Sequence, residues 1–126
     1  MVVLDAPKTE RSRLRQEARQ RLAAYPAGLQ TVVRQVVDLV HPLRVILFGS
    51  QARGDARPES DWDLMVVVPE GTNNRLATRK LYGGVESMGC DYEFIVATPG
   101  TLEKYKDNCA LVYKWGLQDG WEVYVS

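Results

Sequence analysis

Two aspartates with one residue between them stand near the middle of the chain. Asp61 and Asp63 stand at the start of an apolar run, and we expect residues 63–68 to form a strand. Because side chains alternate across a strand, carboxylates at positions i and i+2 point to the same side. Carboxylate oxygens are ligands that Mg²⁺ accepts, with substrate phosphates and water filling the remaining positions. The pair therefore predicts a metal clamp that works together with a phosphate-bearing substrate.

A Gly-Ser pair that precedes the aspartates could bind those phosphates. Gly49 and Ser50 follow the apolar run 44–48, and ten residues separate them from Asp61. Glycine lets the backbone approach a ligand closely, and a helix that starts here, expected over residues 50–55, offers free N–H groups to an anion. The two pairs together predict a site for a nucleotide and a metal.

These residues carry a family resemblance. Gly49-Ser50, ten intervening residues and then Asp61-x-Asp63 resemble the signature of the DNA polymerase beta-type nucleotidyltransferase superfamily. The fuller stretch GSQARGDARPESDWDLMVVV is similar to its minimal nucleotidyltransferase (MNT) branch, including Ala52-Arg53-Gly54 after the Gly-Ser and Ser60 before the acidic pair. The resemblance is strong over residues 48–66 and looser over the rest of 29–126.

The family resemblance also implies a third carboxylate, because two hold a two-metal cluster poorly. It is expected on a strand that ends in a Thr-Pro pair, and counting back from Thr98-Pro99 along the predicted strand 91–97 leads to Glu93. Asp91 lies two residues earlier on the same face and is the alternative third ligand. Either choice departs from the family's Asp, since Glu93 is longer by a methylene and Asp91 shifts the register. We favour Glu93.

The activity implied by the resemblance is transfer of AMP, or another nucleoside monophosphate, from an NTP to an acceptor hydroxyl with two Mg²⁺ ions, ATP being the favoured substrate. The implied residues are Asp61, Asp63 and Glu93 for catalysis and metal binding, and Gly49, Ser50 and Arg53 for the nucleotide. MNT domains pair with HEPN-type RNase toxins, so the acceptor would be a toxin side chain and the chain an AMPylating antitoxin. Two alternatives stay open: a non-catalytic antitoxin that acts by contact, and a small-molecule transferase of the aminoglycoside type.

The helices and strands expected around this site indicate an α+β fold in which helices back a small mixed β-sheet. The family resemblance implies that this fold is of the polymerase beta-like nucleotidyltransferase type. A chain of 126 residues with 45% hydrophobic residues suits a single domain, 1–126. Apolar runs and alternation predict strands at 44–48, 63–68, 91–97 and 121–125. Helical spacing predicts helices at 9–24, 29–40, 50–55, 101–108 and 110–118, and a weaker one at 73–87.

The first of these helices is an Arg-rich N-terminal element at about 9–25, with Thr9 as a candidate N-cap. It is either a solvated cover for the sheet, which we favour, or a docking surface for an acidic partner or RNA. The single histidine, His41, precedes a proline and is interpreted as a helix cap rather than a catalyst. Trp115 and Trp121 are interpreted as core residues rather than as stackers for a nucleobase.

Composition narrows the remaining classes. A formal net charge of zero gives no strong nucleic-acid signal. Two cysteines without metal-type spacing fit reduced thiols, and we expect no membrane span and no secretory leader. The predicted location is therefore the cytoplasm.

Overall fold

One mixed four-stranded sheet forms the centre of the computed structural model, which describes residues 2, 10–87, 89–108 and 111–126. Its order is β3-β2-β1-β4, with β1 antiparallel to both β2 and β4, and β2 parallel to β3. The strands are β1 (Arg44–Phe48), β2 (Trp62–Val67), β3 (Tyr92–Ala97) and β4 (Trp121–Val125). The predicted α+β class with a mixed sheet is confirmed.

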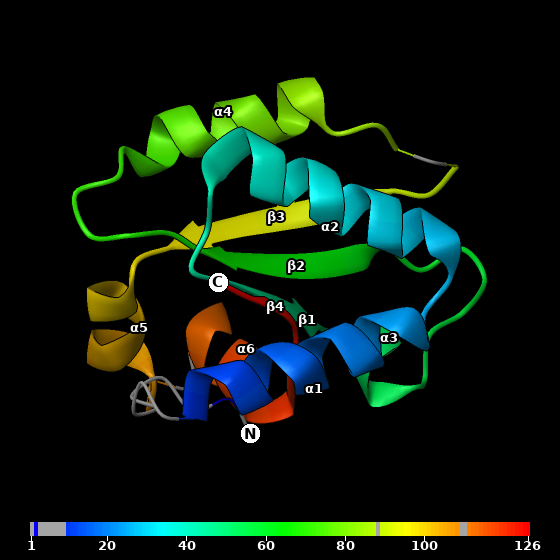
Figure 1. Cartoon of the computed structure of the whole chain (residues 1–126), viewed down its shortest axis with the longest axis horizontal. Coiled ribbons are helices and arrows are strands. Elements are labelled where there is room, and N and C mark those ends of the chain that lie inside the picture. The colour runs from blue at the N-terminus through cyan, green and yellow to red at the C-terminus, as the bar shows by residue number, and fades with distance from the viewer. Residues whose placement is uncertain (1, 3–9, 88, 109–110) are drawn as a thin grey trace.

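Six helices in the described residues surround this sheet (Figure 1). They are α1 (Arg11–Ala23), α2 (Ala27–Val40), α3 (Ser50–Arg53), α4 (Asn74–Gly84), α5 (Pro99–Tyr105) and α6 (Val112–Asp119). Helices α2 and α4 pack on one face and bury the larger apolar cluster, while α5 and α6 pack on the other. Helix α1 runs along β4, and α3 follows β1 directly (Figure 1).

Alternation along β2 decides which face of the sheet carries the acidic residues. Trp62, Leu64 and Val66 belong to the cluster under α2 and α4, whereas Met65 belongs to the cluster under α5 and α6. Because side chains alternate, Asp63 lies on the same face as Met65. The α5/α6 face is therefore the candidate functional face.

The predicted boundaries agree closely with the structure. The bounds of β1 and β4 are as predicted, and most other ends shift by one to three residues. Helix α4 includes Gly83 and Gly84 as its last two residues, and it is capped by Asn73, whose side chain accepts from the Leu76 N–H. His41 ends α2 in the left-handed conformation with φ 47°, and its N–H donates to Val37 O at 3.0 Å. Thr9 and Cys109 lie outside the described residues.

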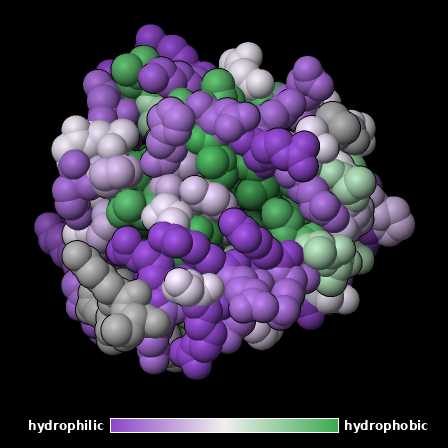
Figure 2. Space-filling view, viewed as in Figure 1, coloured by the Kyte–Doolittle hydropathy of each residue, from purple (hydrophilic) through white to green (hydrophobic). Residues whose placement is uncertain are grey.

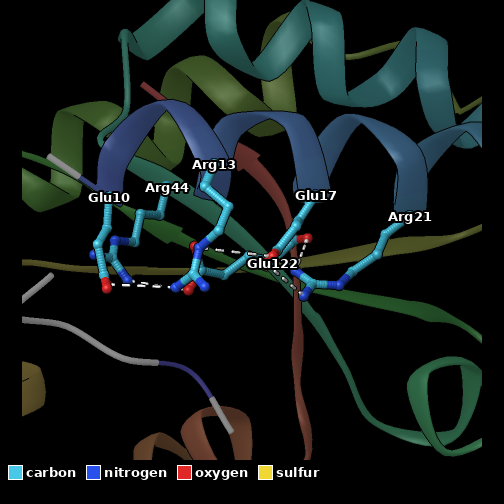
Figure 3. Close-up of polar contacts among 6 residues, drawn as sticks. All are labelled: Glu10, Arg13, Glu17, Arg21, Arg44 and Glu122. Atoms are coloured by element: carbon cyan, nitrogen blue, oxygen red, sulfur yellow. Dashed lines mark hydrogen bonds and ion pairs between the residues drawn. The ribbon is translucent and has the colours of Figure 1, made fainter.

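The arginines of α1 make contacts within the fold. Arg15 Nε donates to the carbonyl of Ser126 at 2.8 Å, and Arg21 Nη1 donates to the carbonyl of Glu122 at 3.3 Å. Figure 3 shows Arg13 and Arg21 reaching Glu17 on the same helix, at 3.9 and 3.6 Å. The surface over α1 is mostly hydrophilic in Figure 2. These contacts favour the solvated cover over the docking surface.

The strands β1 and β4 are also joined by a buried ion pair. Arg44 Nη1 lies 3.1 Å from Glu122 Oε1, and both side chains are largely buried (Figure 3). Burial raises the pKa of Glu122, an effect that the charges of Arg44 and Arg21 partly offset. Glu122 Oε2 has no hydrogen-bond partner among the described residues.

The two tryptophans predicted to be core are instead exposed, each to 45%. Helix α6 turns Gly116 and Leu117 toward the sheet, so Trp115 one position earlier faces outward. Trp121 opens the edge strand β4, where the guanidinium of Arg21 lies 5.3 Å from its ring centroid. The prediction was wrong because helix phase and strand position at the sheet edge were not visible from residue type.

None of the helices in the described part of the chain combines the length and the apolarity needed to cross a bilayer.

Candidate active site

The turn between β1 and α3 places the Gly-Ser pair at one end of the sheet. Gly49 has φ 74°, a left-handed conformation that glycine adopts without strain, and its carbonyl accepts from the N–H groups of Ala52 and Arg53 at 3.1 Å each. Gly54 ends α3 at φ 82°, and its N–H donates to Ser50 O at 3.0 Å. The half-buried Ser50 therefore begins the helical turn beside the end of β1.

Gly49 also lies directly against the acidic pair. Phe48, the last residue of β1, is the Cα partner of Asp63 across the β1–β2 pair, so Gly49 after it passes the Asp63 side chain. A Cβ built on Gly49 would overlap Asp63 Oδ2. Glycine is therefore required here for two reasons, its backbone conformation and the space that the carboxylate occupies.

Strand register decides which of the two candidate carboxylates lies beside Asp63. Asp63 of β2 and Glu93 of β3 are Cα partners in the parallel pair, and both project to the same face. Asp91 precedes β3, and its carbonyl accepts from the N–H of Trp62 at 3.0 Å. The structure thus brings Glu93, rather than Asp91, next to Asp63.

The acidic cluster has a clear electrostatic signature. The pKa of Asp63 is raised from 3.8 to about 6, first by burial, then by the charge of Glu93 and the hydrogen bond with it, and then by the charge of Asp61. The charge of Arg53 acts in the opposite direction. Strongly perturbed carboxylates are typical of functional sites, although structural ion pairs also produce them. Here like charges face one another, which is a cost that a bound cation would remove.

The side-chain oxygens of the acidic cluster can be compared with the ligands that a metal ion requires. Asp61, Asp63 and Glu93 supply hard carboxylate oxygens, the ligand type that Mg²⁺ requires. The described residues contain no group of three His, Cys, Asp or Glu side chains already gathered around one point. Asp61 and Glu93 are exposed and free to reorient. The donor chemistry therefore fits Mg²⁺, while the side chains as they stand are not arranged as a complete ligand sphere.

Hydrogen bonds hold the loop between α3 and β2 in place. Ser60 accepts the Arg57 N–H on its hydroxyl at 2.8 Å and donates its own N–H to Arg57 O at 3.0 Å. Gln51 Nε2 donates to Ser60 O at 3.3 Å and so ties α3 to the residue before Asp61. Gln51 was missed as a positioning residue by sequence reasoning, since its partner is a backbone carbonyl nine residues away.

Arg53, the predicted nucleotide-binding cation, is exposed at the end of α3. Its Nε lies 3.3 Å from Asp55 Oδ2, in an exposed ion pair. Exposed pairs of this kind contribute little and break easily, so the guanidinium can turn to a phosphate. Its charge already acts on Asp63, which places it on the side of the acidic cluster.

A Gly-Ser turn, an acidic pair on the antiparallel neighbour strand and a third carboxylate in register define the polymerase beta-like nucleotidyltransferase class of α+β domains. Residues 29–123 match the family model of the nucleotidyltransferase domain, and the chain belongs to that family.

Solved structures with the same fold agree with this assignment. One is a crystal structure of a toxin-antitoxin with AMP-PNP, with a TM-score of 0.54 and 15% identity, covering 77% of this chain and 73% of that one. Another is a candidate nucleotidyltransferase from Sulfolobus solfataricus, with a TM-score of 0.52 and 21% identity, covering 89% of this chain and 87% of that one. At these identities the likeness concerns the fold. No curated protein sequence matches the chain.

Proposed function

We propose that the chain transfers AMP from ATP to a hydroxyl group of a partner protein, with Asp61, Asp63 and Glu93 as its catalytic residues. The observation that carries the proposal is the register of Asp63 with Glu93, beside the Gly49 turn. Membership of the nucleotidyltransferase family supports the reaction type. The identity of the acceptor rests on analogy rather than on a residue of this chain.

In the proposed reaction each of these side chains has one role. Gly49 and Ser50 bind the triphosphate, and Arg53 contacts the transferring phosphate. The acceptor oxygen forms a bond to the α-phosphorus, the bond from that phosphorus to the bridging oxygen breaks, and pyrophosphate leaves. The hydroxyl proton passes to the carboxylate of Glu93. Asp61, Asp63 and Glu93 would hold Mg²⁺, which would neutralise the charge on the phosphates.

The class of partner is taken from the structural neighbour and from the MNT resemblance. The neighbour is described as a toxin-antitoxin with AMP-PNP, an ATP analogue. We propose a HEPN-type RNase toxin as partner and a hydroxyl-bearing side chain, such as tyrosine, as the acceptor. Addition of AMP would introduce a bulky anion on the toxin and so block its activity.

A second function is favoured by two observations. The described residues contain no complete three-ligand group for a metal, and the third carboxylate is a glutamate. A chain with weak catalysis could neutralise its partner by contact alone. The same fold and the same partner would then serve a binding antitoxin.

Intact mass separates the two functions. The partner that copurifies with the chain is incubated with ATP and Mg²⁺, in parallel with a complex of the Asp61→Asn, Asp63→Asn variant. We expect the partner to gain one or more AMP units with the native chain and none with the variant. An unmodified partner in a stable and neutralised complex would instead establish the contact antitoxin.

A further inference from the structure

The two edge strands of the sheet, β4 and β3, differ in what lies beside them. At the β4 edge, helix α1 lies alongside the strand, and Arg15 and Arg21 donate to the carbonyls of Ser126 and Glu122 (Figure 1). At the other edge, β3 pairs with β2 and with no further strand in the described part of the chain. Exposed strand edges are templates for another extended segment, and proteins normally cover them. The β3 edge carries neither lysine nor proline.

The backbone pattern shows which groups face outward. The N–H groups of Trp62 and Val68 donate to the carbonyls of Asp91 and Ala97, so odd-numbered residues of β3 are the ones bonded to β2. The N–H and carbonyl groups of the alternate residues Tyr92, Phe94 and Val96 therefore point away from the sheet. The Phe94 N–H agrees with this direction, since it donates to the hydroxyl of Tyr82 on α4 at 3.0 Å.

We infer that β3 is a docking edge for an extended segment of the acceptor protein, which adds to the sheet as a fifth strand and carries the acceptor hydroxyl. This inference rests on the proposed function and names how its substrate binds. Exposed Asp91 and Glu93 make the start of the edge acidic, so the segment it fits has basic residues around the hydroxyl-bearing one.

Register places the acceptor at the catalytic group. Strands in a sheet lie about 4.8 Å apart, and directly opposed residues project to the same face. A residue opposite Glu93 on the added strand therefore projects to the face that carries Asp63. The backbone N–H and carbonyl of Glu93 face β2. An antiparallel segment on the other side would therefore pair with Glu93 without hydrogen bonds between the two residues, and in such pairs the side chains lie closer together.

A hollow beside the strand can hold a neighbouring side chain of the segment. A cavity of about 170 Å³ lies at the start of β3, lined by Leu81, Tyr82, Val85, Tyr92 and Phe94 among others. These are the residues of the opposite face, where positions next to the acceptor would project. The edge thus combines backbone bonds for affinity with one apolar site for specificity, as in other cases of strand addition.

The test uses a synthetic peptide and does not depend on catalysis. The peptide has valine at alternate positions, a central tyrosine, and lysine or glutamine elsewhere, and a second copy is methylated on the backbone nitrogens. We expect millimolar unmethylated peptide to shift the amide resonances of Tyr92, Phe94 and Val96 more than those of Glu93 and Ile95. Equal shifts with both peptides, or none with either, would overturn the inference.

A pair of variants sharpens the result. Tyr82→Phe removes the hydroxyl that occupies the Phe94 N–H and should tighten peptide binding by about fivefold, the worth of one hydrogen bond. Tyr124→Phe removes a hydroxyl from the covered β4 edge and should leave binding unchanged. If protein concentration alone, without peptide, produces the same amide shifts, the edge pairs with a second copy of the chain and the peptide assignment is wrong.

The proposed function and the docking edge can fail separately. Peptide binding at β3 without AMP transfer to any acceptor would refute the function and leave the edge standing. AMP transfer to a protein acceptor without the amide pattern at β3 would refute the edge and leave the function standing.

Discussion

Asp63 and Glu93 are Cα partners across the parallel β2–β3 pair, and both side chains project to the face of the sheet covered by α5 and α6. Asp91 lies outside this pair, before the start of β3. The register therefore favours Glu93 over Asp91 as the third carboxylate of the proposed site.

Replacing Glu93 should cost far more activity than replacing Asp91. Glu93→Gln removes the group that accepts the proton of the hydroxyl, and such groups contribute about 10²- to 10⁴-fold to rate. Asp91→Asn is the matched control and should keep most of the activity. The measurement is the rate of AMP incorporation into the acceptor. The opposite order of losses would assign the third position to Asp91.

The acidic cluster should make stability fall as pH rises. The pKa of Asp63 is about 6 in the folded chain against an ordinary 3.8, so the native state holds more protons than the unfolded state between these values. Stability therefore decreases as pH rises through this window and stays lower above it. Asp63→Asn removes the effect.

The check is urea unfolding without divalent ions. After allowance for solvent screening, we expect Asp63→Asn to gain about 1 kcal/mol relative to the native chain near pH 7.5, and to lose that gain near pH 4. A difference between the two proteins that is the same at both pH values would contradict the account.

The turn at Gly49 should tolerate no side chain. Gly49→Ala would bring a Cβ onto Asp63 Oδ2 and would also hold alanine at φ 74°, so we expect loss of both stability and AMP transfer. Gly54→Ala is the control, because φ is 82° there but the space around it is open. It should cost about 1 to 2 kcal/mol of backbone strain and retain activity. Equal loss of activity in both variants would show that strain alone matters.

Breaking the buried ion pair of Arg44 and Glu122 should cost more stability than breaking the shorter but exposed pair of Lys106 and Glu103. Arg44→Leu leaves the buried carboxylate of Glu122 without its main cation and should destabilise the chain by about 3 to 5 kcal/mol. Glu103→Gln breaks an exposed pair with Lys106 at 2.7 Å and should change stability by about 0.5 kcal/mol or less. Chemical denaturation compares the two, and similar losses would contradict the ranking by burial.

Local patterns predicted the parts of the site that lie close together in sequence. The Gly49-Ser50 turn and the Asp61–Asp63 pair are joined by one short loop, so their spacing alone indicated them. The family motif that ends in Thr98-Pro99 favoured Glu93 over Asp91, but which of them lies beside Asp63 depends on the register of two strands distant in sequence, which no local pattern contains. The exposure of Trp115 depends in the same way on which side of α6 packs against the sheet.

The measurement that tests the central claim most directly follows two labels of ATP into the acceptor. The copurified complex is incubated with Mg²⁺ and ATP labelled at the α-phosphate, or at the γ-phosphate, and the protein is then separated and counted. Nucleotidyl transfer at the acidic cluster predicts the α label on the acceptor, no γ label, and neither label with Asp63→Asn. The γ label on the acceptor, or an undiminished α label with the variant, would contradict the account.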